Sequence, residues 1–266
     1  MSNDNKMTIK VELPEAVNAI VKKPAETLGD KLGDLMEIIF GGITYKKEKI
    51  MLKRENNLNE FKKSLIKNIA EIPEGKKIDP PENIIGTALE AVKYKIDIES
   101  IREMFAKLIA SAMNEDTSDE VLPIFIETLK GLSGQDAVAL KELCSIRMSH
   151  IIPIIEIGDN MFCLPNMRSR YCPFLSNKFG IDQSNTILDT LLRYQLIELR
   201  YVFDKDSCFQ GFTFKNIEQE FSEIRRNVPR DVGRPIEYKY GTVVLTSLGY
   251  EFSKICTPEF KPNLDE

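Results

Sequence analysis

The residue types that perform catalysis are sparse in this sequence. Its one histidine, His150, lies between a predicted helix and an apolar run, without cysteine or carboxylate partners at metal-ligand spacing. Gly41-Gly42 lacks the Gly-Lys-Ser/Thr continuation of a phosphate-binding loop. The histidine is therefore interpreted as structural, and we predict no metal site and no cofactor.

Two local patterns resemble activated nucleophiles. Ser133-Gly134-x-Asp136 places a hydroxyl near a carboxylate, but no histidine is close and the glycine elbow of hydrolases is absent. The same spacing is typical of a capping box at the start of a helix, which is the favoured interpretation. Cys172 follows Arg170 and Tyr171, and only this proximity suggests a reactive thiol. We therefore predict that the protein is not an enzyme.

Cysteine usage and apolar runs indicate the compartment. The five cysteines are an odd set without a Cys-x-x-Cys pair, which is typical of a reduced, intracellular protein. The first residues are polar, unlike a signal peptide, and the apolar run over residues 35–43 is far shorter than the roughly 20 residues that cross a bilayer. We expect a cytoplasmic protein without a transmembrane span, and peripheral membrane contact is left open. The cysteines are Cys144, Cys163, Cys172, Cys208 and Cys256.

Composition fits a soluble globular chain of one or two domains. Of 266 residues, 42% are hydrophobic and 29% are charged, which is enough apolar material for a sizeable core. The formal net charge of -5 at pH 7 excludes a surface that is basic throughout. Any contact with nucleic acid or anionic lipid must therefore come from local patches.

Two groups of basic residues could form such patches. Between residues 44 and 67, lysine and arginine outnumber the acids, which could attract phosphate on lipid or nucleic acid, although a solvated helix face is the favoured interpretation. This candidate basic surface comprises Lys46, Lys47, Lys49, Lys53 and Arg54. A second group joins one arginine on a predicted helix to a loop with proline and glycine. These candidate phosphate-contacting residues are Arg193, Arg225, Arg226, Arg230 and Arg234.

Apolar residues recur every three or four positions through the first half, which predicts a succession of amphipathic helices. A helix over residues 14–40 either faces a core, the favoured interpretation, or lies on a membrane or partner. The next helices are expected over residues 44–69 and 83–94, separated by a proline-containing loop. Their predicted buried residues are Leu58, Phe61, Leu65 and Ile69 in the first, and Ile84, Ile85, Ala88, Leu89 and Val92 in the second.

Two further helices complete this half. Asp97 is the predicted N-cap of the first of these helices. Ser118 is the predicted N-cap of the second, which carries Pro123 near its start and ends at Gly131. The predicted buried faces are Ile98, Ile101, Phe105, Leu108, Ile109 and Ala112, then Leu122, Phe125, Ile126 and Leu129. A helix over residues 134–145, capped by Ser133, then begins the second half.

From residue 151 the pattern changes to short β-rich runs. Strands are predicted over residues 152–157 and 161–164 around a turn, with a helical turn over 173–179. Ser184 or Asn185 is expected to cap a helix that buries Ile187, Leu188, Leu191 and Leu192. Strands over residues 196–203 and 240–245 and a helix started by Thr246 close the chain. This order predicts a winged helix, used either for nucleic acid or, as favoured, for protein interaction or structure.

Several motifs, in this order and spacing, resemble the bacterial abortive infection alpha family. They include Phe105-Ala-Lys-Leu-Ile-Ala-Ser-Ala-Met113, Pro123-x-Phe125-x-x-x-Leu129, Leu132-Ser-x-x-Asp136-Ala137 and Leu245-Thr246-x-x-Gly249-x-x-Phe252-x-x-x-Cys256. Gly29-Asp30 and Asn57-Leu58-x-x-Phe61 leading to Ile72-Pro73 belong to the same set. The sequence has Leu122-Pro123 where the family pattern is expected to carry a His-Pro pair. The resemblance implies anti-phage defence, in which an infected cell stops growing before the phage matures.

The fold class expected is mainly α with a small β component. We predict a disordered N-terminus over residues 1–12, a multi-helix domain over 13–132, a winged-helix-like domain over 133–256 and a tail over 257–266. Two functions remain open. One is a non-enzymatic defence protein with a helical effector half and a sensor or interaction half, and the other is a nucleic-acid-binding regulator that uses the Arg225–Arg234 loop. A protein partner or self-association is expected for the first, and nucleic acid for the second.

Overall fold

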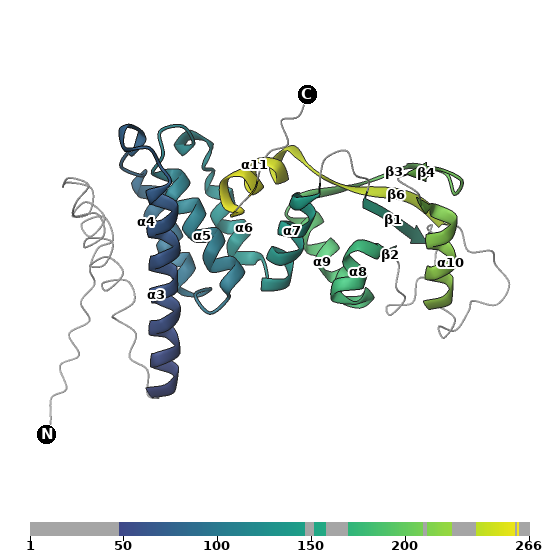
Figure 1. The fold of residues 1–266 in the computed structure, drawn as a ribbon, viewed down its shortest axis with the longest axis horizontal. Coiled ribbons are helices and arrows are strands. Elements are labelled where there is room, and N and C mark those ends of the chain that lie inside the picture. The colour runs from purple at the N-terminus through teal and green to yellow at the C-terminus, as the bar shows by residue number, and fades with distance from the viewer. Residues whose placement is uncertain are drawn as a thin grey trace, which may run out of the picture. The chain divides into compact units, whose positions relative to one another are not determined.

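In a computed structural model, the structure describes residues 48–146, 152–157, 170–209, 212–224, 238–258 and 260. Helices dominate these ranges, and four of the strands form one antiparallel sheet (Figure 1). The expectation of a mainly α chain with a small β component is therefore confirmed. The predicted helix over 14–40, the disordered start, the strand over 161–164 and His150 lie outside the described residues.

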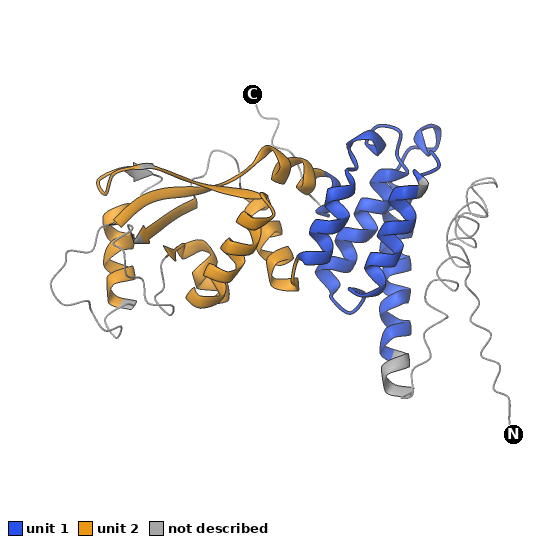
Figure 2. Ribbon diagram, turned by 180° about the vertical axis from the view of Figure 1, so that it is seen from behind, with its two compact units in different colours: residues 1–131, 255–258 blue, residues 132–254, 259–266 orange. Residues whose placement is uncertain are grey.

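The chain divides into two compact units (Figure 2). The helical unit comprises the described residues up to Gly131, joined by Ile255–Pro258. The sheet unit comprises Leu132–Lys254 and the described residue Phe260. The last helix of the sheet unit thus ends in residues that belong to the helical unit.

Helix α5 is the centre of the helical unit (Figure 1). It packs against α3 and α4, and α6 packs against both α4 and α5. The helices span α3 (Glu48–Ala70), α4 (Glu82–Lys93), α5 (Glu99–Ala112) and α6 (Pro123–Gly131), with short 3-10 turns at Glu74–Lys76 and Ser118–Glu120. Ten of the residues of α5 are buried, which explains why its sequence reads as apolar on more than one face.

Helical spacing predicted most of this core correctly. In α3, Phe61 and Leu65 are fully buried and Ile69 nearly so, and all five apolar residues predicted for α4 are buried. Ile101, Phe105, Leu108, Ile109 and Ala112 fill the core side of α5. Because residues three and four apart lie on one face of a helix, the sequence period alone places these side chains together.

The predicted cap at Asp97 is wrong. Helix α5 begins after Ile98, which has an extended backbone and no side-chain capping bond. The Asp97 carboxylate instead accepts a hydrogen bond from Asn57 Nδ2 of α3 at 2.8 Å. A partner 40 positions away in the sequence therefore holds the side chain that local spacing assigned to the helix start.

The predicted start of α6 is also wrong. Ser118 lies in a separate 3-10 turn, and α6 begins only at Pro123. As a result Leu122 precedes the helix and is 41% exposed, whereas Phe125, Ile126 and Leu129 are buried as expected. Helix α6 ends at Gly131, as predicted.

The sheet unit opens with α7 (Gly134–Ser145), whose predicted limits are confirmed. Ser133 Oγ accepts a hydrogen bond from the Asp136 backbone at 3.2 Å, and the Asp136 carboxylate accepts one from the Ser133 backbone at 2.8 Å. These reciprocal bonds form the predicted capping box and satisfy two backbone donors at the free end of the helix.

The four-stranded sheet has the order β2-β1-β6-β3 and is antiparallel throughout. Its strands are β1 (Ile152–Ile157), β2 (Arg170–Tyr171), β3 (Ile197–Phe203) and β6 (Tyr238–Leu245). Val243 of the central β6 lies opposite Ile152 on one side and Leu199 on the other. The strands predicted over residues 152–157, 196–203 and 240–245 are confirmed to within two residues.

Two helices precede β3, namely α8 (Pro173–Phe179) and α9 (Ile181–Arg193). The proposed caps Ser184 and Asn185 are wrong, because α9 begins one turn earlier, directly after Gly180. Gly180 has a φ of +78°, a left-handed conformation that glycine adopts without strain and that lets α8 pass straight into α9. Ser184 Oγ instead donates back to the Gly180 carbonyl at 2.5 Å.

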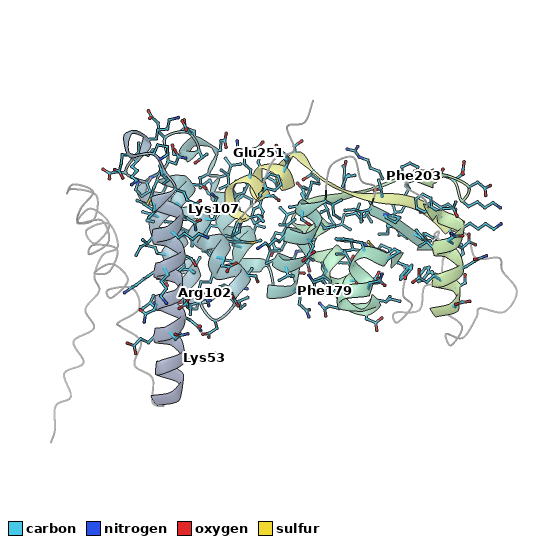
Figure 3. All side chains as sticks on the ribbon, viewed as in Figure 1. Lys53, Arg102, Lys107, Phe179, Phe203 and Glu251 are labelled. Carbon is cyan, nitrogen blue, oxygen red and sulfur yellow. The ribbon has the colours of Figure 1, made fainter. Side chains whose placement is uncertain are left out.

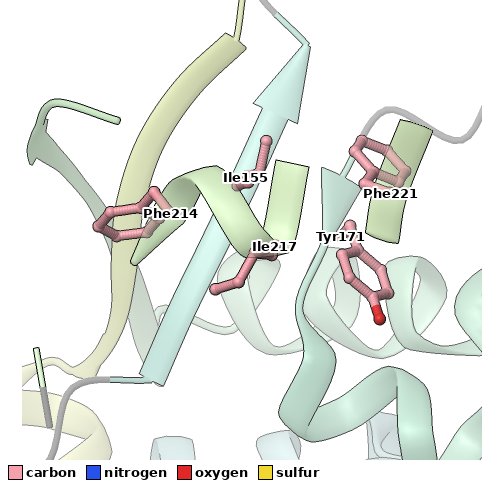
Figure 4. Close-up of a cluster of buried hydrophobic side chains, with 5 residues drawn as sticks. All are labelled: Ile155, Tyr171, Phe214, Ile217 and Phe221. Carbon is pink, nitrogen blue, oxygen red and sulfur yellow. The ribbon is translucent and has the colours of Figure 1, made fainter. Parts of the chain in front are cut away.

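An insertion between β3 and β6 was not predicted as structure. It contains the small hairpin β4 (Cys208–Phe209) and β5 (Phe212–Thr213), followed by α10 (Phe214–Ile224). Helix α10 packs against β1 through Phe214, Ile217 and Phe221, which join Ile155 and Tyr171 in one buried cluster (Figure 4). The rings of Tyr171 and Phe221 stack with centroids 5.3 Å apart. The spacing of the three apolar residues in α10 is helical, so the signal was present in the sequence.

Helix α11 (Ser247–Cys256) is the last helix in the described chain. Thr246 Oγ1 accepts a hydrogen bond from the Gly249 backbone at 2.8 Å, which confirms Thr246 as the predicted start. The Thr246 backbone in turn donates to the Leu196 carbonyl at 3.1 Å, so α11 begins against the residue directly before β3.

Candidate functional site

The helix α9 carries one of the candidate phosphate-contacting residues. Its buried face is Ser184, Ile187, Leu188 and Leu191, and Arg193 lies exposed in its last turn. The exposed positions earlier in α9 include Asp182 and Asp189. Asp189 forms an ion pair with Arg170 of β2, so its carboxylate already has a partner within the sheet unit. The outward face of α9 therefore combines a single terminal cation with two carboxylates.

The other four candidate arginines, Arg225, Arg226, Arg230 and Arg234, lie outside the described residues. Their grouping with Arg193 therefore stays a prediction. What it does describe is the helix α10 that leads into this stretch, and that helix is held by tyrosine–glutamate hydrogen bonds. Tyr240 donates to Glu218 Oε2 at 2.8 Å and Tyr171 donates to Glu220 Oε1 at 2.5 Å.

These tyrosines are locked in their neutral form. Burial first, and then the hydrogen-bonded carboxylate, raise the pKa of Tyr171 and Tyr240 far above the ordinary value, because a phenolate would be poorly solvated and repelled. Each hydroxyl is therefore a permanent donor that fixes α10 to the sheet. The arrangement is structural, since both partners are occupied by each other.

The candidate basic surface on α3 is described only in part. Lys46 and Lys47 lie outside the described residues, and the structure describes no side chain for Lys49. Lys53 is exposed, whereas Arg54 is half-buried and its Nη2 donates to the Lys93 carbonyl at 2.9 Å. Arg54 thus joins α3 to the end of α4, and Lys53 is the member that the structure leaves fully at the surface.

A basic residue that the sequence did not single out is buried in the helical unit. Arg102 of α5 (Figure 3) is only 8% exposed, and its Nη1 donates to the Ile96 carbonyl at 2.9 Å. That bond ties the start of α5 to the turn before it. Little in the sequence indicated this burial. Arg102 is next to Ile101 of the apolar stripe, but arginine is a residue type that usually lies at the surface.

The residues that carry the motifs have structural roles in the described chain. Leu132 and Ala137 are fully buried beside the Ser133–Asp136 capping box. In the closing motif, Thr246 caps α11, and Phe252 and Cys256 are fully buried. A Cβ at Gly249 would lie 1.8 Å from the Leu196 carbonyl oxygen, so the close approach of α11 to β3 requires glycine there.

Comparison with protein families decides the identity at the family level. The model for abortive infection alpha matches residues 53–256, which is more than half of the 266 residues and runs through both units. The chain belongs to the abortive infection alpha family. No curated protein matches it, and no solved structure does. Membership implies a role in phage defence, which agrees with the resemblance seen in the sequence.

No metal centre emerges in the part of this family member that the structure describes. No group of three or more histidine, cysteine, aspartate or glutamate side chains there could hold an ion. As for membranes, none of the helices within the described ranges combines the length and the apolar character needed to cross one.

The described thiols of this abortive infection alpha protein are poor nucleophiles. Burial raises the pKa of Cys144 and of Cys172 to about 11, and it also raises the pKa of Cys256 well above its ordinary value. Cys172, which follows Arg170 by two positions, is buried, so its thiol is shielded from solvent. The thiolate, the reactive form, is therefore scarce at neutral pH.

We expect the native protein to resist alkylation at these three positions. With a pKa of about 11 for Cys144 and Cys172, the thiolate fraction at pH 8 is on the order of 10⁻³. Iodoacetamide treatment followed by peptide mass mapping should label them rapidly only after unfolding in guanidinium. Fast labelling of Cys172 in the native chain would contradict both its burial and its raised pKa.

Proposed function

We propose that this protein is a non-enzymatic effector of abortive infection. In this proposal the helical half, residues 13–132, carries the action that stops growth, and residues 133–256 sense infection or bind a partner. The observation that carries the proposal is the family match, which extends through both units. A defence role that needs both units explains why the match does not stop at the boundary between them.

The motif residues support a non-enzymatic action. Those in the described chain cap helices, fill the core or allow close backbone contact, as at Ser133, Thr246 and Gly249. Burial and raised pKa make the described cysteines unsuitable as nucleophiles. Residues with these roles stabilise the fold. A protein that acts by binding needs a stable fold but no reacting side chain.

The order of elements supports a winged-helix-like module in the sheet unit. Helices α8 and α9 lie between β1 and β3, and β6 returns to pair between these two strands. Helix α9 would then occupy the recognition position. Arg193 is the one cation of this helix and Asp189 is paired with Arg170, so α9 offers little for phosphate to bind, which favours a protein partner.

The helical half is proposed as the effector, acting on a protein partner or on the inner membrane surface. Exposed Lys53 continues the basic run of α3, which can attract anionic lipid. Two variants separate the roles of the halves: Lys46, Lys47, Lys49 and Lys53 to Glu in the helical half, and Arg193→Glu in the sheet unit. Each is expressed in bacteria, and membrane recovery, growth without phage and phage plating are measured for each.

The proposal expects the wild type to slow growth and to reduce plating. The lysine variant should lose growth inhibition and any membrane recovery, while Arg193→Glu should keep the intrinsic toxicity. Equal behaviour of wild type, both variants and an empty vector in all three measurements would refute the proposal. If the lysine variant loses growth inhibition but the wild type is never recovered with membranes, the target of the effector is a protein.

A nucleic-acid-binding regulator is the second candidate, favoured by the winged-helix-like order of elements. It would use Arg193 together with Arg225, Arg226, Arg230 and Arg234. Contacts to phosphate release counterions, so binding to duplex DNA or RNA must weaken steeply as salt rises. Absent or salt-independent binding in a fluorescence anisotropy titration would eliminate this candidate.

A further inference from the structure

The surface of the helical unit carries two small patches, each with exposed apolar side chains at its centre. The charged residues around one patch are basic, and those around the other are acidic. Only four large hydrophobic side chains are exposed among the described residues: Ile66 at 53%, Tyr94 at 74%, Leu122 at 41% and Ile124 at 48%. Tyr94 interacts with its neighbours Glu90 and Lys93. The other three lie on α3 and at the start of α6, and each of the two sites is rimmed by charges of one dominant sign.

The basic patch is formed by Lys62, Lys63, Ile66 and Lys67 of α3. Lys62, Lys63 and Ile66 share one face of the helix, because residues three and four apart lie side by side. Phe61, Leu65 and Ile69 turn inward, so Ile66 cannot reach the core. The Lys63 side chain is 73% exposed even though it also pairs with Glu60. The lysine stems widen the apolar spot while their ammonium groups rim it.

The acidic patch is formed by Asp119, Leu122, Ile124 and Glu127. Buried Val121 and Phe125 anchor this stretch, which leaves Leu122 and Ile124 outward. Ile124 and Glu127 are one turn apart on α6, and Asp119 precedes Leu122 by three positions and is exposed. The Glu127 side chain remains 55% exposed beside its ion-pair partner Lys130. Apolar contact and negative charge are thus presented together.

We propose that these patches bind each other between two copies of this chain. Helix α5 lies between α3 and α6 and packs against both, which keeps the two patches of one chain apart. A basic rim around Ile66 and an acidic rim around Leu122 and Ile124 are complementary in charge and alike in their apolar centres. Pairing of two unlike surfaces either closes into a two-fold dimer or a larger ring, or extends as an open chain of copies.

The test is sedimentation velocity of the full chain over a range of concentrations at low salt. We expect the weight-average mass to rise above the monomer mass of 30.4 kDa with concentration, and to fall back as salt screens the rims. The double variant Lys63→Glu, Lys67→Glu should stay monomeric, and so should the double variant Asp119→Lys, Glu127→Lys. An equimolar mixture of the two should associate again, because each variant then meets its charge complement.

A matched control is Lys205→Glu, Lys215→Glu, which makes the same change in charge on two exposed lysines of the sheet unit. It should associate like the wild type. A wild type that stays at 30.4 kDa throughout would overturn the proposal. In that case the patches would bind another part of the same chain or a different protein. So would association that persists in both patch variants, or a mixture that stays monomeric while circular dichroism shows both variants folded.

Discussion

Gly249→Ala should lower the free energy of unfolding by about 3 kcal/mol or more, at the upper end of overpacking effects. The added Cβ would lie 1.8 Å from the carbonyl oxygen and 3.0 Å from the Cα of Leu196. Both are backbone atoms of the residue directly before β3, so no flexible side chain can give way. Relief requires α11 to move, which strains the Thr246 cap and its hydrogen bond to Leu196.

The measurement is thermal and guanidinium unfolding of the full chain, with Gly75→Ala as the matched control. A Cβ at Gly75 would meet nothing within 4 Å, so this variant should stay within about 0.5 kcal/mol of the wild type. If Gly249→Ala unfolds at the same temperature as Gly75→Ala, the close approach of α11 to β3 does not exist as described.

Phe105→Ala should cost about 3–5 kcal/mol, because it empties the centre of the helical unit. Phe105 is fully buried in α5, the helix that packs against α3, α4 and α6. Truncation removes the apolar surface of the ring and leaves a cavity that three rigid neighbours cannot close. Leu108→Ala, also fully buried, should cost about 2–5 kcal/mol for the same reason.

Glu103→Ala is the control on the same helix. Its side chain is half-exposed, and alanine suits a helix at least as well as glutamate, so the change should be within about 0.5 kcal/mol. The three variants are compared by denaturant midpoint at constant slope. Equal midpoints for Phe105→Ala and Glu103→Ala would contradict the central place of α5 in the core.

Local signals predicted those parts of the fold that local interactions determine. The capping box of Ser133 and Asp136 involves residues three apart, and the limits of α7 follow directly from it. The apolar faces of α4 and α5 likewise follow from the helical period. Where a distant partner competes, the sequence misleads: Asp97 has the chemistry of a cap, but Asn57 takes its carboxylate.

The start of α9 and the presence of α10 show two other limits. The left-handed backbone of Gly180 joins α8 to α9, a junction that a search for side-chain caps overlooks. Helix α10 was readable from Phe214, Ile217 and Phe221, but it interrupts the order of strands expected for a winged helix. The candidate sites were the least predictable part. Charge alone did not reveal that Arg54 bonds to Lys93 or that Asp189 is held by Arg170.

The proposed role of this chain as an abortive infection effector is tested most directly by a one-step growth experiment. Cells that express the protein are infected so that nearly every cell receives a phage, and surviving cells and released phage are counted over one cycle. The account predicts that infected cells stop dividing, do not survive and release few phage, and that Phe105→Ala abolishes this effect. A phage yield and a course of lysis equal to those of empty-vector cells, for every phage tried, would contradict it.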